Sequence, residues 1–242
     1  NRQLAFKIEA LKEIEENLKK KNIPFFVLVD NPPAGGSKES GKLIEKFAKK
    51  VKAGAVVTDF YPLKIVRAWN EHVRKNIDVA FFGVDAHNIV PAWVTSDKKE
   101  FAAYTIRPKI HKLLPEFLDD FPKLGIHKFD FKQKVKGDDY EKLLNKKDLE
   151  KSLEEIYWAP TGESGAEKVL KRFLKDGIRS YADLRNDPNE DAQSNISPYL
   201  HYGMIAPQRV VLEVVKITGK DITKIIHQNK NKAKVDKDKP LT

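Results

Sequence analysis

The chain has 242 residues, of which 33% are charged and none is cysteine, and its formal net charge is +10. This length fits one large domain or two small ones, and the lack of thiols excludes a disulfide framework, a thiolate metal site and a cysteine nucleophile. The positive charge favours anionic partners, although most of the lysines fit solvated helix faces equally well. No run of about 18 apolar residues could span a bilayer, so we expect a soluble, intracellular protein.

The first part of the chain alternates between helix and strand patterns. Apolar residues recur at steps of three and four from Leu4 to Leu18, which predicts an amphipathic helix. The apolar run Phe25–Val29 predicts a strand. The alternation then continues, with helices predicted over 43–51 and 63–73 and strands over 55–58 and 79–84. This order is typical of βαβ units, so we predict an α/β fold with a Rossmann-like parallel sheet that has helices on both faces.

The pattern also predicts where this α/β part begins and ends. A doubly wound domain normally begins with a strand, so we expect at least one strand to precede Asn1. A basic helix is predicted over 106–118, and Pro122 and Gly125 mark its end. We therefore predict an α/β domain over residues 1–125.

The rest of the chain carries a different pattern. Residues 126–157 are rich in lysine and only patchily apolar, which predicts an interdomain linker. Strand-type runs then vanish, and helices are predicted over 166–174, 198–203 and 210–217. Residues 158–242 are thus expected to form the beginning of an all-helical domain. This domain is expected to be incomplete, because residues 229–242 are polar and charged.

The most specific stretch is Ser194–Gly203, with the sequence SNISPYLHYG. Ser197 followed by Pro198 predicts a helix start, because serine can cap free amides and proline suits the first helical position. Such a helix start can bind a phosphate through its amides and through the hydroxyls of Ser194 and Ser197. On these residues alone, an ordinary capped helix explains the stretch equally well.

Several segments in chain order carry a resemblance to one family. They are Val57–Leu63, Asp85–Trp93, Tyr104–Ile110, Trp158 with Pro160, Gly162 and Glu163, Asp183–Pro188 and Ser194–Gly203. Together they resemble the photolyase and cryptochrome family, and residues 85–93 with 104–110 resemble the signature of class II DNA photolyases. The resemblance implies a lyase that binds flavin adenine dinucleotide (FAD) and uses light to split cyclobutane pyrimidine dimers in UV-damaged DNA.

The resemblance also implies which residues bind the flavin. The pyrophosphate loop corresponds to Gln193, Ser194, Asn195, Ile196 and Ser197, and the tyrosine at the phosphate-ribose side corresponds to Tyr181. Gln193 stands where many relatives have threonine, which leaves a hydroxyl contact in doubt. An antenna chromophore of unknown type is implied for the α/β domain.

The family's remaining helices supply most of the flavin pocket, so we expect a chain ending at Thr242 to be inactive in repair by itself. No residue is assigned as catalytic, and Trp69, Trp93 and Trp158 are not assigned to an electron path. A monomer is expected. Two alternatives stay open: a cryptochrome-like flavin photoreceptor, and a non-catalytic basic α/β module that binds nucleic acid or a nucleotide.

Other polar motifs are interpreted as structural or left open. His87 is expected to be a loop residue, and no second cluster with ligand spacing accompanies it to form a metal site. His201 and Tyr202 fit a packing role as well as a flavin-side role. Gly35–Lys38 lacks the remaining glycine and the Gly-Lys-Ser/Thr ending of a phosphate-binding P-loop. A basic row fits either phosphate contact or a solvated helix face; it consists of Arg107, Lys109, His111 and Lys112.

Overall fold

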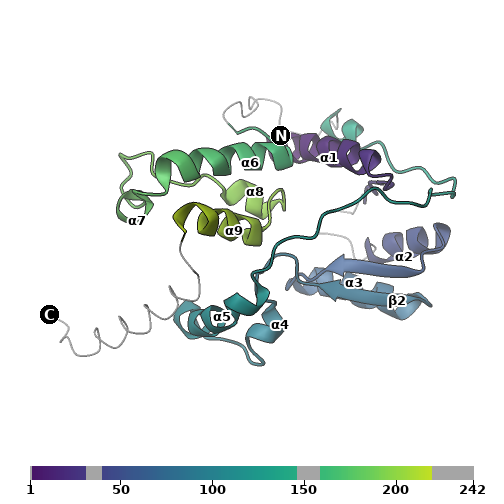
Figure 1. Cartoon of the computed structure of the whole chain (residues 1–242). Coiled ribbons are helices and arrows are strands. Elements are labelled where there is room, and N and C mark those ends of the chain that lie inside the picture. Colours follow the sequence, from purple (N-terminus) through teal and green to yellow (C-terminus); the bar gives the residue numbers. More distant parts are fainter. Residues whose placement is uncertain (1, 31–39, 146–158, 220–242) are drawn as a thin grey trace. The chain divides into compact units, whose positions relative to one another are not determined.

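The computed structural model describes residues 2–30, 40–145 and 159–219. Gly35–Lys38, Trp158 and residues 229–242 lie outside the described residues. The chain divides into two compact units, one of residues 1–85 and 123–168 and the other of residues 86–122 and 169–242. The helix α6 (Gly162–Arg172) carries the chain from one unit into the other (Figure 1). The predicted domain limits, with a linker over 126–157, stay a prediction.

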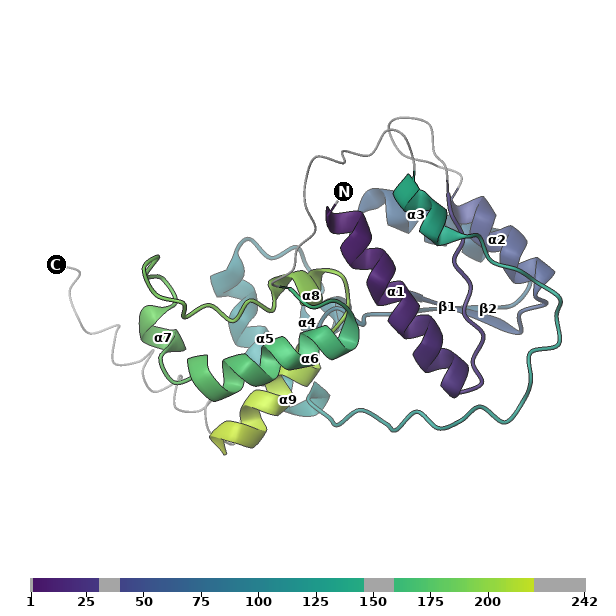
Figure 2. The ribbon, with the colours of Figure 1, turned by 90° about the horizontal axis from the view of Figure 1, so that it is seen from above.

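The first unit contains a βαβ element. The strands β1 (Ala55–Asp59) and β2 (Ala80–Val84) are parallel, with Ala55 opposite Ala80 and Asp59 opposite Val84 (Figure 2). The helix α3 (Lys64–Asn76) connects the two strands. It packs on α2 (Ser40–Lys50), where Nε2 of His72 lies 2.8 Å from Oε2 of Glu45. The predicted α/β class is confirmed.

One face of this sheet lacks cover among the described residues. Val57, Phe82 and Val84 are 66%, 54% and 49% exposed, whereas the alternating residues Val56 and Phe81 are half-buried. Successive side chains of a strand point to opposite faces, so the exposed residues share one face. The predicted helices on both faces of the sheet are therefore not found in the described parts of the chain.

The segment after α1 (Arg2–Lys20) differs from the prediction. Residues 23–30 form no strand, so the prediction of a strand over Phe25–Val29 is wrong for the described structure. The backbone bonds of this segment go to a loop: the carbonyl of Val27 accepts from the amide of Asp138 (2.8 Å), and the amide of Val29 donates to Oδ2 of Asp138 (2.8 Å). An apolar run becomes a strand only where a neighbouring strand completes its hydrogen bonds. Here the amide and the carboxylate of Asp138 form the hydrogen bonds that a neighbouring strand would otherwise provide.

The short helix η1 (Tyr140–Asn145) follows this loop in the first unit. The hydroxyl of Tyr140 donates to Oε2 of Glu15 on α1 (2.7 Å), and Nζ of Lys12 lies 3.1 Å from Oε1 of Glu141. Burial, followed by the nearby Glu15, raises the pKa of Tyr140 to about 12. These contacts attach η1, and with it the preceding loop that contains Asp138, to α1.

The described part of the second unit is helical. Its elements are α4 (Ala92–Thr95), α5 (Ala103–Phe117), the end of α6 with a π-helical turn η2 (Phe173–Gly177), α7 (Tyr181–Leu184), α8 (Ser197–His201) and α9 (Pro207–Thr218). All elements described between residues 159 and 219 are helices, as predicted. The buried core of the unit includes Leu170, Leu174, Tyr199 and Met204. No helix in the described ranges is long and apolar enough to cross a membrane.

Candidate functional site

The candidate anion site is the turn from Gln193 to Ser197, which leads into α8. Asn195 has a left-handed backbone (φ 54°), and Ile196 follows in a right-handed helical conformation (φ −84°, ψ −13°). Left-handed and right-handed residues in succession turn consecutive amides toward one side, which creates a concave site for an anion. Asparagine tolerates this left-handed conformation better than most residues. The backbone of the turn therefore suits an anionic ligand.

The polar groups of this turn are open. Among the described residues, the hydroxyls of Ser194 and Ser197 make no hydrogen bond, and the amides of residues 194–197 donate to no backbone carbonyl. Ser197 is exposed and Ser194 is half-buried. Polar groups in folded proteins normally find partners in protein or water, so these donors remain available to a ligand.

The predicted helix start at Ser197 is confirmed, but its predicted serine cap is wrong. The helix begins at Ser197 with Pro198 in its first turn, and the capping position is held by Ile196, which makes no side-chain cap bond. Ser197 is already helical, so its hydroxyl is not placed to cap the amides that follow. The amides at this helix start consequently keep their partial positive charge.

Buried apolar residues hold the turn in place. Ala192, Ile196 and Tyr199 are 4%, 7% and 1% exposed. The amide of Tyr199 donates to the carbonyl of Ile196 (3.1 Å), and the amide of Met204 donates to the carbonyl of Tyr199 (2.8 Å). Burial also raises the pKa of Tyr199, so its phenol stays neutral at physiological pH. Buried side chains therefore hold the turn whose amides and serine hydroxyls have no partner among the described residues.

The structure brings Gln193 to the end of α7, close to Arg185. Nε2 of Gln193 donates to the carbonyl of Arg185 (2.6 Å), so the Gln193 side chain fastens the turn to α7. The guanidinium carbon of Arg185 lies 5.5 Å from the ring centre of Tyr181, whose other contact is an edge-to-face one with Phe173 (5.3 Å). Arg185 is a functional candidate that the sequence analysis missed. Its spacing of four residues from Tyr181 on a helix was the available signal.

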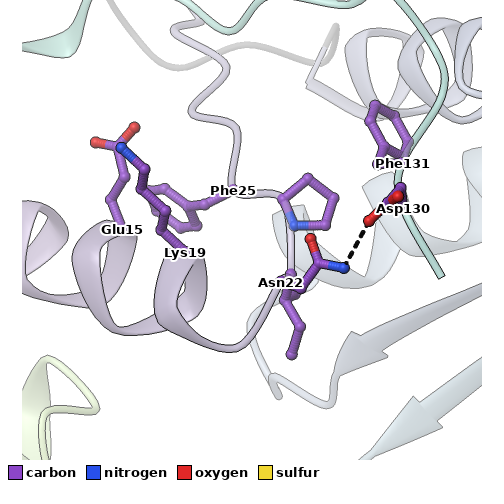
Figure 3. A pocket seen from close by; sticks show the side chains of 8 residues that line it. Glu15, Lys19, Asn22, Phe25, Asp130 and Phe131 are labelled. Atoms are coloured by element: carbon purple, nitrogen blue, oxygen red, sulfur yellow. Dashed lines mark hydrogen bonds between the residues drawn. The ribbon is translucent and has the colours of Figure 1, made fainter. Parts of the chain in front are cut away.

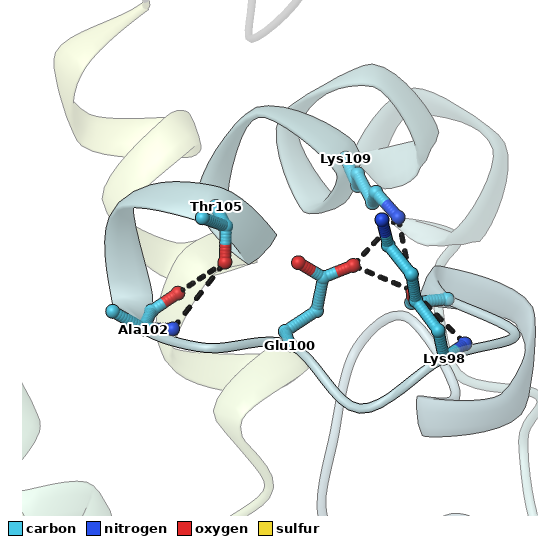
Figure 4. A network of polar contacts seen from close by, with 6 residues as sticks. Lys98, Glu100, Ala102, Thr105 and Lys109 are labelled. Atoms are coloured by element: carbon cyan, nitrogen blue, oxygen red, sulfur yellow. Dashed lines mark hydrogen bonds and ion pairs between the residues drawn. The ribbon is translucent and has the colours of Figure 1, made fainter.

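The basic residues of α5 differ in whether they contact a carboxylate. Nζ of Lys109 lies 2.6 Å from Oε1 of Glu100 and 2.9 Å from Oγ of Ser96, and Oγ of Ser96 donates to Oε1 of Glu100 (2.7 Å) (Figure 4). The Lys109 ammonium, followed by the Ser96 and Thr105 hydroxyls, lowers the pKa of Glu100 to about 2. Lys109 is therefore a structural residue. Arg107 and Lys112 are exposed and have no carboxylate partner in the described ranges.

The remaining polar candidates lie on the surface. His87 is exposed on the loop after β2, and His201 is exposed with its ring 4.7 Å from the ring of Tyr202. Trp93 is 51% exposed. No group of three or more His, Cys, Asp and Glu residues in the described part of the chain could hold a metal ion.

Two hollows lie away from the turn. One, of about 350 Å³, lies in the first unit between the C-terminal end of α1 and the loop residues Asp130 and Phe131. At its edge, Nδ2 of Asn22 donates to Oδ1 of Asp130 (2.9 Å; Figure 3). The other, of about 610 Å³, lies between η2 and α9 in the second unit. Neither is lined by Tyr181 or by residues 193–197.

Comparisons with known proteins agree on one family. A family model described as DNA photolyase matches residues 1–125. The chain is 36% identical over 217 residues to the deoxyribodipyrimidine photo-lyase of Potorous tridactylus, covering 89% of this chain and 39% of that protein. It is 37% identical over 226 residues to the deoxyribodipyrimidine photo-lyase of Arabidopsis thaliana, covering 89% of this chain and 44% of that protein. The chain thus spans less than half the length of either relative.

Solved structures support the fold. A bacterial class III photolyase from Agrobacterium tumefaciens matches with a TM-score of 0.59 at 18% identity, covering 86% of this chain and 43% of that one. A cryptochrome from Synechocystis sp. PCC6803 matches with a TM-score of 0.63 at 15% identity, covering 94% of this chain and 48% of that one. At these identities the likeness concerns the fold alone.

Proposed function

The chain belongs to the DNA photolyase family, and from this premise we propose that the complete protein is a monomeric class II deoxyribodipyrimidine photo-lyase that repairs UV-damaged DNA with bound FAD. The similarity to two photo-lyases over 89% of the chain supports the activity. The resemblance of residues 85–93 and 104–110 to the class II signature supports the class. When bound, reduced FAD supplies the light-excited electron that splits the dimer, and the protein supplies binding and orientation.

The turn from Gln193 to Ser197 fits the pyrophosphate of this cofactor. One observation carries the assignment: consecutive amides and two serine hydroxyls face no acceptor among the described residues, on a backbone turn suited to an anion. Ser194 and Ser197 would donate through their hydroxyls, and the amides of Asn195 and Ile196 would complete the site. Gln193 would act through its backbone, because its side chain is bonded to Arg185.

Tyr181 and Arg185 fit the ribose-phosphate side of the ligand. The bond from Gln193 to Arg185 fixes the end of α7 against the turn. The hydroxyl of Tyr181 makes no hydrogen bond to another described residue, so it can donate to a ligand. The guanidinium of Arg185 would offset phosphate charge near the turn.

A pair of Ser197 variants in the complete protein tests the site. Ser197→Asp should place a carboxylate against the phosphates, and like-charge repulsion in a partly dry site should weaken binding by roughly a few kcal/mol. Flavin should then be lost during purification. Ser197→Asn has the same shape without the charge and should retain most of the flavin. Retention of flavin at wild-type stoichiometry in Ser197→Asp, with folding confirmed by circular dichroism, would remove Ser197 from the site.

A repair assay separates the proposed activity from its two alternatives. The complete protein is illuminated with a thymine-dimer oligonucleotide, and loss of the dimer is measured beside flavin content. Repair supports the photo-lyase. Bound flavin without repair would favour a cryptochrome-like photoreceptor, and absence of both would favour a non-catalytic basic module.

A further inference from the structure

A second exposed surface lies on the α4–α5 hairpin, apart from the flavin turn. Phe101 and Tyr104 are 88% and 68% exposed, and neither ring contacts another aromatic ring in the described part of the chain. Scattered exposed apolar residues are normal, but here two strongly exposed aromatic residues lie three positions apart in a segment that also carries exposed cations. This surface, the α5 platform, consists of Lys99, Phe101, Tyr104, Arg107 and Lys112.

Helix geometry places three of these residues on one side of α5. Arg107 and Lys112 lie three and eight residues beyond Tyr104, so the three side chains fall within the same half of the helix surface. All three are exposed. Lys99 and Phe101 lie within four residues of the helix start, so the two rings are flanked by cations along one short segment.

A polar network holds the backbone of the segment that carries the platform. Oγ1 of Thr105 donates to the carbonyl of Ala102 (2.8 Å) at the start of α5, between the two exposed rings in sequence. The ion pair of Lys109 with Glu100 ties the preceding loop to the helix (Figure 4). These contacts hold the backbone that carries the two rings, so less conformational entropy is lost when a ligand stacks on them.

The charges of the platform are uncompensated. Lys99, Arg107 and Lys112 have no carboxylate partner among the described residues, in contrast to Lys109. Protein-binding surfaces share the enrichment in aromatic residues and arginine, but they are depleted in lysine at their centres. Exposed rings flanked by two lysines and an arginine match the needs of a nucleic acid strand, whose bases stack on aromatic side chains and whose phosphates attract cations. A duplex keeps its base faces inside its own stack and cannot use the rings.

We propose that the α5 platform binds single-stranded nucleic acid, with bases stacked on Phe101 and Tyr104 and phosphates held by Lys99, Arg107 and Lys112. This binding requires neither a flavin nor a damaged base, so it is independent of the proposed repair activity. It adds a binding surface for unpaired nucleotides outside the flavin turn.

A titration of the 242-residue chain tests the role of the rings. The probe is a fluorescently labelled 12-nucleotide oligo(dT), compared at low salt with a duplex of equal length by fluorescence anisotropy. We expect tighter binding of the single strand, and at least about fivefold weaker binding for each ring removed in Phe101→Ala and Tyr104→Ala. Phe129→Ala is the matched control, because Phe129 is 76% exposed in the other unit, and it should bind as the wild type does.

Charge reversal tests the role of the cations. Lys99→Glu with Arg107→Glu should weaken single-strand binding and reduce the slope of log affinity against log salt by about 0.7 for each phosphate that the variant no longer neutralises. Lys46→Glu with Lys50→Glu makes the same change in net charge on the exposed side of α2 and should have a smaller effect.

Three results would overturn the proposal. The first is an equal decrease of binding in the platform variants and their controls, and the second is equal affinity for single strand and duplex. The third is self-association of the chain that Phe101→Ala and Tyr104→Ala abolish without a change in oligo(dT) affinity, which would make the platform a protein-binding surface. Ser197→Asp should leave oligo(dT) binding unchanged, so failure of the flavin assignment and failure of this one remain distinct.

Discussion

Two helix starts in this chain use the same backbone feature in opposite ways. At the start of α6, the carboxylate of Glu13 accepts from the amide of Ser164 (2.9 Å) and from its hydroxyl (3.3 Å). At the start of α8, the amides and hydroxyls of Ser194 and Ser197 meet no acceptor among the described residues. Free amides at a helix start carry partial positive charge in both places. The chain neutralises one start with its own side chain and leaves the other available.

The difference shows how a binding site can be told from a structural motif. A serine at a helix start is compatible with either role. What separates the two is whether another part of the fold already supplies the anion. The start of α6 is stabilised internally by Glu13, so an external anion gains little there, whereas the donors of the α8 turn have no acceptor among the described residues.

The start of α6, where Glu13 accepts from Ser164, depends on a glycine, and its replacement should change the free energy of unfolding most. Gly162 has φ of +77°, and a Cβ at this position would collide with the Glu13 carboxylate. Gly162→Ala should therefore destabilise the chain by about 1–2 kcal/mol from backbone strain alone, measured by urea unfolding. Gly54→Ala is the control, because nothing lies within 4 Å of its Cβ position, and it should be neutral or slightly stabilising. Equal stability of the two variants would show that α6 does not need the close approach of Glu13.

Removing a polar group at each helix start should affect the stability of the chain at α6 but not at α8. Glu13→Gln keeps the side-chain shape but loses the charge at the start of α6, which should cost about 0.3–1 kcal/mol. Ser197→Ala removes a hydroxyl without a protein partner among the described residues and should change stability by less than about 0.5 kcal/mol. Thermal unfolding of both variants without flavin measures this. A larger loss of stability in Ser197→Ala would mean that the α8 turn is a structural cap.

A weaker effect is a pH dependence of the free energy of unfolding that arises at the start of α6. Burial, followed by the nearby carboxylates of Glu13 and Glu167, raises the pKa of Glu163 above its ordinary value of 4.5. The folded chain thus holds this proton more tightly than the unfolded chain. The resulting stability is fully present below about pH 4.5 and is lost as the pH rises through the raised pKa.

Replacing Glu163 tests this dependence. Glu163→Gln should equal the wild type at about pH 4 and should be the more stable protein at about pH 7, as measured by urea unfolding at both values. Glu16→Gln, at an exposed position on α1, should show no such divergence. If the stability difference between Glu163→Gln and the wild type is the same at both pH values, Glu163 is solvated in the folded chain.

Local sequence patterns correctly predicted the type and approximate position of most described elements. The apolar stripe from Leu4 to Leu18 became α1, and the run over 55–58 became β1. The run over 79–84 became β2, and Ser197 with Pro198 began α8. These features follow from the spacing of neighbouring residues, because periodicity and helix starts are local properties of the chain.

Which polar groups find a hydrogen-bond partner depends on contacts between distant parts of the chain. Glu13 meets a residue 151 positions away, and Asp138 takes the backbone bonds of the apolar run Phe25–Val29. Lys109 is bound inward by Glu100, whereas Arg107 on the same helix has no carboxylate partner among the described residues. Local spacing cannot reveal these outcomes, because each depends on a partner that only the folded chain brings near. The availability of a donor or a charge for a ligand is therefore decided by the fold.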